Sequence, residues 1–119
     1  MDLTPRRQAD LVILHPAGRI DHFNAQEFAQ ALEPELQVCH SSGCRLVFDL
    51  SGLAYISSAG LRVLMLAAKQ VGPRGGRIAL AAPQPVVREI IEISRFNLVF
   101  PLHASVDEAV SALPPGAKP

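Results

Sequence analysis

The chain has 119 residues, and its eleven basic and eleven acidic side chains cancel to a formal net charge of zero. A balanced charge gives no global field that would favour nucleic acid or an anionic membrane surface. No apolar run approaches the ~20 residues that span a bilayer. Apolar residues make up 49% of the chain, but five Phe and one Tyr are its only aromatic side chains. We therefore expect one cytosolic domain with an aliphatic core, without direct contact to nucleic acid and without membrane insertion.

The first third of the chain predicts an arm, two short strands and a helix. Residues 1–8 are polar without any period and predict a flexible N-terminal arm. Aliphatic runs at 11–14 and 18–20 predict strands that are separated by a proline turn. Asn24, followed three residues later by Glu27, is typical of a capping box and predicts a helix start.

The remaining elements alternate between strands and helices. The predicted ranges are strands at 45–49, 77–82 and 98–100, and helices at 58–71, 85–94 and 106–113. The order is β-β-α-β-α-β-α-β-α, which indicates an α/β fold with a mixed, mostly parallel five-stranded sheet and about four helices. We expect the domain to span residues 9–113 and to be followed by a flexible tail at 114–119.

Two adjacent serines stand where a buried strand leads through a loop into a strong helix. The strand at 45–49 ends in Asp49, a turn follows, and Ser57 and Ser58 precede the helical run. A hydroxyl at this point lies beside the unpaired N–H groups and the positive dipole end of a helix, where an added anion is tolerated. Serine is also a favoured helix cap, so the pair is explained either by capping alone or by a regulatory role.

The helix predicted at 58–71 has more apolar surface than one buried face requires. One stripe faces the sheet and consists of Leu61, Leu64, Met65, Ala68 and Val71. Further apolar side chains fall elsewhere around the helix, at Val63, Leu66 and Ala67. An amphipathic surface helix needs an apolar stripe of about 100°. Either a second element of the domain covers the surplus, or its outer face meets a partner.

Catalytic and cofactor motifs are weak in this sequence. It contains no nucleophile elbow, no phosphate-binding loop and no dinucleotide fingerprint. Asp21 or Asp49 with His22 could be combined with Ser58 into a Ser-His-Asp triad, but no spacing positions His22 as its base. We expect no enzyme activity, no catalytic residue and no cofactor.

The two cysteines do not form a recognisable metal site. Cys39 and Cys44 are five residues apart with His40 between them, a spacing that matches no standard zinc pattern. Two reduced, partly buried thiols are expected instead.

The segment Asp49–Leu64, with the letters Asp-Leu-Ser-Gly-Leu-Ala-Tyr-Ile-Ser-Ser-Ala-Gly-Leu-Arg-Val-Leu, resembles the signature of STAS domains. It resembles in particular that of bacterial anti-sigma factor antagonists. The resemblance continues upstream through Gly18-Arg19-Ile20-Asp21 to the helix start at Asn24-Ala25. The order of predicted elements fits the same fold, so nearly the whole chain is covered.

The resemblance implies a partner-switching function. In this family an anti-sigma factor with serine kinase activity phosphorylates the antagonist at the start of its second helix. The unphosphorylated antagonist binds that kinase. A metal-dependent serine phosphatase removes the phosphate and restores the unphosphorylated antagonist. The implied acceptor is Ser58, with Ser57 as the alternative. Ser57 occupies a position that is Asp in many members. The positions expected to contact the partner are Asp21, Ser57, Gly60, Leu61, Arg62, Met65 and Lys69, with core positions as the alternative for Leu61 and Met65.

Two other functions are compatible with the resemblance. The chain could be a STAS module that is not phosphorylated, such as a scaffold or the small subunit of a lipid-transport complex, in which the same helix face binds its partner constitutively. Nucleotide binding by the domain itself is a third hypothesis, although the sequence contains no phosphate-cradling loop.

Overall fold

The computed structural model describes residues 1–38 and 44–113, which fold into two sheets and four α-helices. The main sheet has five strands in the order β1-β2-β4-β6-β7. Strand β1 pairs antiparallel with β2, and all the other pairs in this sheet are parallel. The predicted α/β class with a mixed, mostly parallel five-stranded sheet is therefore confirmed. The strands are β1 (Arg6–Gln8), β2 (Leu11–Leu14), β4 (Arg45–Asp49), β6 (Arg77–Ala81) and β7 (Leu102–His103).

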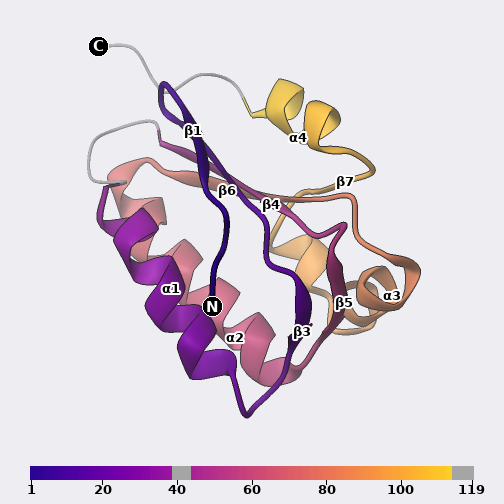
Figure 1. Ribbon diagram of the computed structural model, residues 1–119. Coiled ribbons are helices and arrows are strands. Elements are labelled where there is room, and N and C mark those ends of the chain that lie inside the picture. Colours follow the sequence, from indigo (N-terminus) through magenta and orange to yellow (C-terminus); the bar gives the residue numbers. More distant parts are fainter. Residues whose placement is uncertain (39–43, 114–119) are drawn as a thin grey trace.

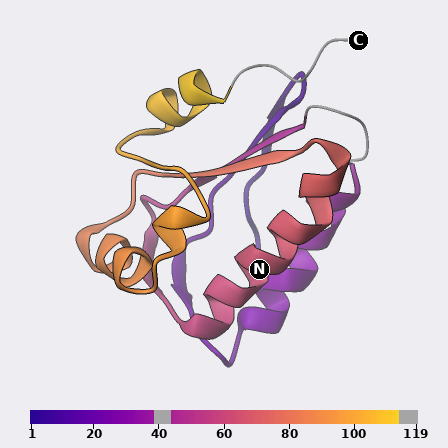
Figure 2. The same ribbon diagram turned by 180° about the vertical axis from the view of Figure 1, so that it is seen from behind.

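The helices cover the main sheet on two sides (Figure 1). Helices α1 and α2 lie side by side against one face, and α4 lies on the opposite face; Figure 2 shows the same layers from behind. Helix α3 packs next to β5 and a short 3₁₀ turn, η2 (Phe96–Leu98), and a second turn, η1 (Gly72–Arg74), follows α2. The helices are α1 (Ala25–Gln37), α2 (Ser58–Val71), α3 (Pro85–Ile93) and α4 (Val106–Ala112).

The central strands are continuously apolar because both of their faces are buried. Leu46, Val47 and Phe48 in β4 have no solvent exposure. Phe48 belongs to the large cluster that includes residues of α1 and α2, whereas Val47 packs with Ala109 of α4 in a smaller cluster. A parallel strand between two helical layers has this pattern, and it explains why β4 was predictable from a short apolar run.

A separate two-stranded sheet carries the serine loop. Strands β3 (Gly18–Ile20) and β5 (Leu53–Ile56) pair in parallel with each other and not with the main sheet. The sequence predicted residues 18–20 as part of one five-stranded sheet and placed 53–56 in a loop, so both assignments are corrected. The pairing matters for the site, because it brings the chain after β3 next to the chain after β5.

The predicted N-terminal arm is folded onto the domain. Leu3 is only 3% exposed, and the His15 N–H donates to its carbonyl oxygen at 2.7 Å. Strand β1 follows, and Arg7 forms an ion pair of 2.6 Å with the buried carboxylate of Glu35 in α1. The expectation of a flexible arm at 1–8 is therefore wrong, because one leucine and one ion pair anchor a segment that looks polar overall.

The strand predicted at 98–100 is also corrected. This segment begins at the end of η2 and forms no strand. Phe100, just after η2, is buried, and its N–H donates to the Phe96 carbonyl at 2.8 Å. The strand follows at Leu102–His103. The apolar triplet was misleading because Leu98 and Val99 are exposed. The predicted tail at 114–119 lies outside the described residues.

Candidate functional site

The loop between β5 and α2 gives its two serines different environments. Ser57 has an extended backbone and is the N-cap of α2, where its hydroxyl accepts a hydrogen bond from the Gly60 N–H at 3.3 Å. Its own carbonyl accepts from the Leu61 N–H at 2.9 Å. Ser58 is the first residue of the helix and is exposed. The capping role therefore falls to Ser57, and the hydroxyl of Ser58 lies at the surface beside the start of the helix.

Gly60 permits close packing inside the domain. A Cβ atom at this position would lie 2.7 Å from side-chain atoms of both Ile20 and Ile56, closer than side-chain carbons approach one another. Leu61, the next residue, is 3% exposed and belongs to the large core cluster. The expectation that Gly60 and Leu61 contact a partner is corrected, because both residues hold the start of α2 against β3 and β5.

The other predicted contact positions on α2 lie at or near the surface. Arg62 and Lys69 are exposed, and Met65 is half-buried. Ala67 is buried, and α1 packs alongside α2, so the domain itself covers part of the apolar surplus. Leu66 remains 54% exposed beside a groove of about 220 Å³ between the two helices. The domain thus covers part of the surplus, and contact of the remaining exposed part with a partner stays a prediction.

Asp21 shapes the loop that precedes α1. Its carboxylate accepts hydrogen bonds from the N–H groups of Phe23 at 3.0 Å and Asn24 at 3.2 Å. The Asn24 side chain turns back toward the same loop, accepting from the Asp21 N–H and donating to the Arg19 carbonyl, both at 2.8 Å. Asn24 is the N-cap residue of α1, so the predicted helix start is confirmed, but the predicted capping box is wrong because the Asn24 side chain braces the loop and makes no capping hydrogen bond.

The Asp21 loop and the serine loop are joined through the backbone. The Ser57 N–H donates to the Ile20 carbonyl at 2.8 Å, immediately before Asp21. The side chains of the preceding residues in the two strands also meet, because the Arg19 guanidinium lies 4.5 Å from the centre of the Tyr55 ring. Figures 1 and 2 both show α1 and α2 beginning at the same end of the molecule. The structure therefore places the Asp21 loop next to the loop that carries Ser57 and Ser58, and their contact with a partner stays a prediction.

Comparison with known proteins places this arrangement in a family. The family model for the STAS domain matches residues 3–109. The chain belongs to the STAS domain family. It is 40% identical over 113 residues to BtrV of Bordetella bronchiseptica, a candidate anti-sigma factor antagonist, and 94% of each chain is covered. A crystal structure of an anti-sigma factor antagonist from Mycobacterium paratuberculosis superposes with a TM-score of 0.80 at 26% identity, covering 92% of this chain and 90% of that one.

A more distant relative shares the fold. The anti-sigma factor antagonist SpoIIAA in its unphosphorylated form superposes with a TM-score of 0.73 at 17% identity, covering 92% of this chain and 93% of that one. At this identity the likeness concerns the fold alone. The STAS match begins at residue 3, inside the segment that the sequence predicted to be an arm.

One surface residue of this STAS domain was missed by sequence reasoning. Phe23 follows Asp21 in the loop before α1, and its side chain is 85% exposed. Its ring packs against that of His22, with the ring centres 4.1 Å apart. A phenylalanine between a polar pair and a helix start carries no periodic signal, so only the structure reveals how far it protrudes.

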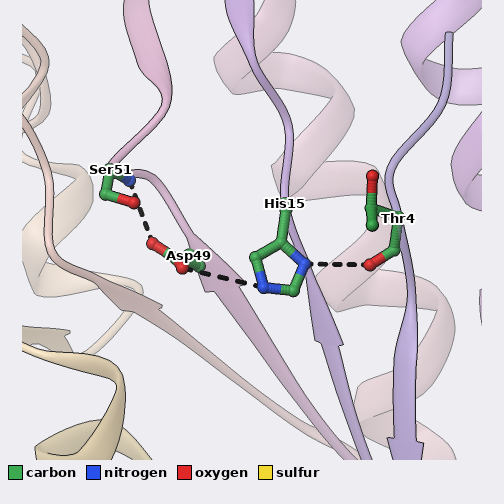
Figure 3. Close-up of polar contacts among 4 residues, drawn as sticks. All are labelled: Thr4, His15, Asp49 and Ser51. Carbon is green, nitrogen blue, oxygen red and sulfur yellow. Dashed lines mark hydrogen bonds and ion pairs between the residues drawn. The ribbon is translucent and has the colours of Figure 1, made fainter.

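Asp49 and His15 are used elsewhere in the STAS domain. Figure 3 shows Asp49 accepting from the Ser51 N–H at 3.0 Å and lying 3.7 Å from His15 Nε2. The other ring nitrogen of His15 hydrogen-bonds with the Thr4 carbonyl at 2.9 Å. These contacts fasten the N-terminal segment to the ends of β2 and β4. Asp49 is thus paired with His15, and not with the His22 of the triad considered above.

Metal and membrane features can be judged for the part of the chain that the structure describes. Within residues 1–38 and 44–113, no three His, Cys, Asp or Glu side chains are placed to share a metal ion. In the same ranges, no helix combines the length and apolarity needed to cross a membrane. Cys44 is disulfide-bonded, so the expectation of a reduced thiol is wrong for this residue. Cys39 and His40 lie outside the described residues.

Proposed function

We propose that this chain is an anti-sigma factor antagonist that works by partner switching. In its unphosphorylated form it binds an anti-sigma factor with serine kinase activity, and phosphorylation of Ser58 releases it. A metal-dependent serine phosphatase then restores the binding form. The observation that carries the proposal is the exposed Ser58 at the first turn of α2, beside a neighbouring serine that already caps the helix. The names of the relatives support the antagonist class.

The start of α2 is suited to receive a phosphoryl group without unfolding. Such a group adds about −1.5 to −2 charges at neutral pH. The helix N-terminus offers N–H donors and a positive dipole end, and the first turn of α2 contains no acidic residue that would repel the group. Arg62, exposed one turn further along, lies at the spacing at which helical side chains of opposite charge interact.

The same charge would interfere with docking. A partner that covers the start of α2 must either strip water from the phosphoryl group or leave it facing an apolar surface, and both are unfavourable. About 3 kcal/mol of interference lowers affinity more than 100-fold. The switch therefore acts on the interface and leaves the fold intact. We assign the protein, its kinase and its phosphatase to the cytoplasm.

The test compares capture of the organism's anti-sigma factor kinase by purified variants. Ser58→Asp is expected to melt like the wild type and to lose capture. Ser111→Asp, the same charge change at an exposed position of α4, is expected to retain capture. Incubation of the wild type with kinase and ATP should place phosphate on Ser58, mapped by mass spectrometry.

Three results would contradict the proposal. Capture by Ser58→Asp equal to that of the wild type would remove the switch, and unfolding of this variant would show that the charge disrupts the fold instead. Stable capture without any phosphate incorporation would favour the constitutive STAS scaffold.

A further inference from the structure

Phe23 is the most exposed large apolar side chain among the residues that the structure describes. It is 85% exposed, whereas Phe28, Phe48 and Phe100 are buried in the core. A largely hydrated phenyl ring forgoes the free energy that burial would provide, and phenylalanine is enriched in protein interfaces. Scattered exposed apolar residues are common, so exposure alone does not distinguish this ring from other surface side chains.

The loop that carries Phe23 is braced on both sides. The Phe23 N–H is bound by the Asp21 carboxylate at 3.0 Å, and the Asn24 side chain ties the loop to the backbone of both Arg19 and Asp21. The His22 ring packs against the phenyl ring with the ring centres 4.1 Å apart. An anchor that is already ordered before binding loses less conformational entropy on association, which increases affinity.

The loop also has a defined position relative to the serine loop. The Ser57 N–H donates to the Ile20 carbonyl at 2.8 Å. Ile20 lies three residues before Phe23, and Ser57 immediately precedes Ser58. Strands β3 and β5 end together, with Ile20 paired with Ile56, so both loops leave the sheet at the same end. A protein that reaches the hydroxyl of Ser58 therefore meets the Phe23 loop in the same contact.

We propose that Phe23 is a preorganised apolar anchor that inserts into an apolar pocket of the anti-sigma factor kinase. This inference rests on the proposed function and names the residue that supplies most of the docking affinity. In this scheme Phe23 provides affinity and Ser58 provides the switch. The partner is expected to present a pocket of the size of one phenyl ring close to its phosphoryl-transfer site. The ring is kept out of the domain's own core, so its removal leaves the fold unchanged.

The experiment measures affinity and phosphorylation kinetics for the wild type, Phe23→Ala and Ile93→Ala. Ile93 is the matched control, since it is 74% exposed on α3. Phe23→Ala is expected to melt like the wild type, to bind the kinase at least ~30-fold more weakly, and to raise the KM for phosphorylation of Ser58 more than it lowers kcat. Ile93→Ala is expected to behave like the wild type in every measurement.

The outcomes separate the anchor from the switch. Equal affinity of Phe23→Ala and the wild type would overturn the anchor while Ser58 remained the switch. An equal loss in Phe23→Ala and Ile93→Ala would also overturn it, because the effect would then be general to exposed apolar surface. No capture of the wild type would overturn both proposals. Phe23→Leu, which keeps an apolar side chain, is expected to retain more affinity than Phe23→Ala.

Discussion

Replacing each serine of the loop by alanine tests the division of roles between them. Ser57→Ala removes the hydroxyl that accepts from the Gly60 N–H, a bond whose length of 3.3 Å is at the long end of the usual range. Loss of an N-cap side chain costs about 0.5–2 kcal/mol, and the long bond places this one at roughly 0.5–1 kcal/mol. Ser58→Ala removes an exposed hydroxyl and inserts the best helix former, so its effect stays within about 0.5 kcal/mol of zero.

Urea unfolding followed by far-UV circular dichroism measures both changes. With a denaturant slope of about 2 kcal/mol/M, the midpoint of Ser57→Ala should fall by roughly 0.3–0.5 M, and that of Ser58→Ala should remain within error. Ser105→Ala is a positive control, because Ser105 caps α4 through a matching bond to the Glu108 N–H at 3.1 Å. Ser57→Asp keeps a capping acceptor and should retain the wild-type midpoint.

The division of roles between Ser57 and Ser58 would be refuted if Ser58→Ala lost as much stability as Ser57→Ala. That result would mean that the hydroxyl of Ser58 is part of the fold, and modification of this residue would then disturb the domain itself. An unchanged midpoint for Ser57→Ala together with a reduced midpoint for Ser105→Ala would show that the cap on α2 contributes nothing.

Two further substitutions test the packing around the site and the anchoring of the N-terminal segment. Gly60→Ala should lower the stability of the domain by about 1–2 kcal/mol in thermal unfolding, because overpacking against Ile20 exceeds the gain in helix propensity. Gly52→Ala is the control, since a Cβ there meets only ordinary contacts and should change stability little. Equal melting of both variants would contradict the close packing at Gly60. Arg7→Ala leaves the Glu35 carboxylate, 7% exposed, without its 2.6 Å partner and should cost about 1–3 kcal/mol. Adding Glu35→Gln to Arg7→Ala should recover part of this loss, and no recovery would argue against the ion pair.

Hydrophobic pattern predicted those elements whose burial is periodic or continuous. Strand β4 is buried on both faces and appears as an unbroken apolar run, and α2 shows an apolar stripe at helical spacing. The small hydroxyl residues at the junction predicted the start of α2. The candidate site followed, because the signature residues stand at this junction.

The features that the sequence did not predict depend on contacts between distant segments. Strand β1 has exposed side chains throughout, so nothing in its composition distinguishes it from a loose arm, and its order comes from pairing with β2 and from the ion pair of Arg7 with Glu35. Strand β5 was missed because Leu53–Ile56 lies close to the turn and pairs outside the main sheet. Asparagine favours side-chain capping of a helix, but the Asn24 side chain hydrogen-bonds to the backbone of Arg19 and Asp21 instead of the N–H groups of α1.

The separation of cap and acceptor has a consequence for how the proposed switch would work. Ser57 closes the first turn of α2 with its own hydroxyl, so the helix keeps its cap whether or not Ser58 carries a phosphoryl group. An Asp at this position would also cap the helix, but its charge would repel a phosphoryl group on the next residue. The neutral serine removes that repulsion, and phosphorylated and unphosphorylated chains should therefore unfold at similar urea concentrations. The difference between the two states then lies in the surface that the partner meets, where a charge that must lose its water opposes docking.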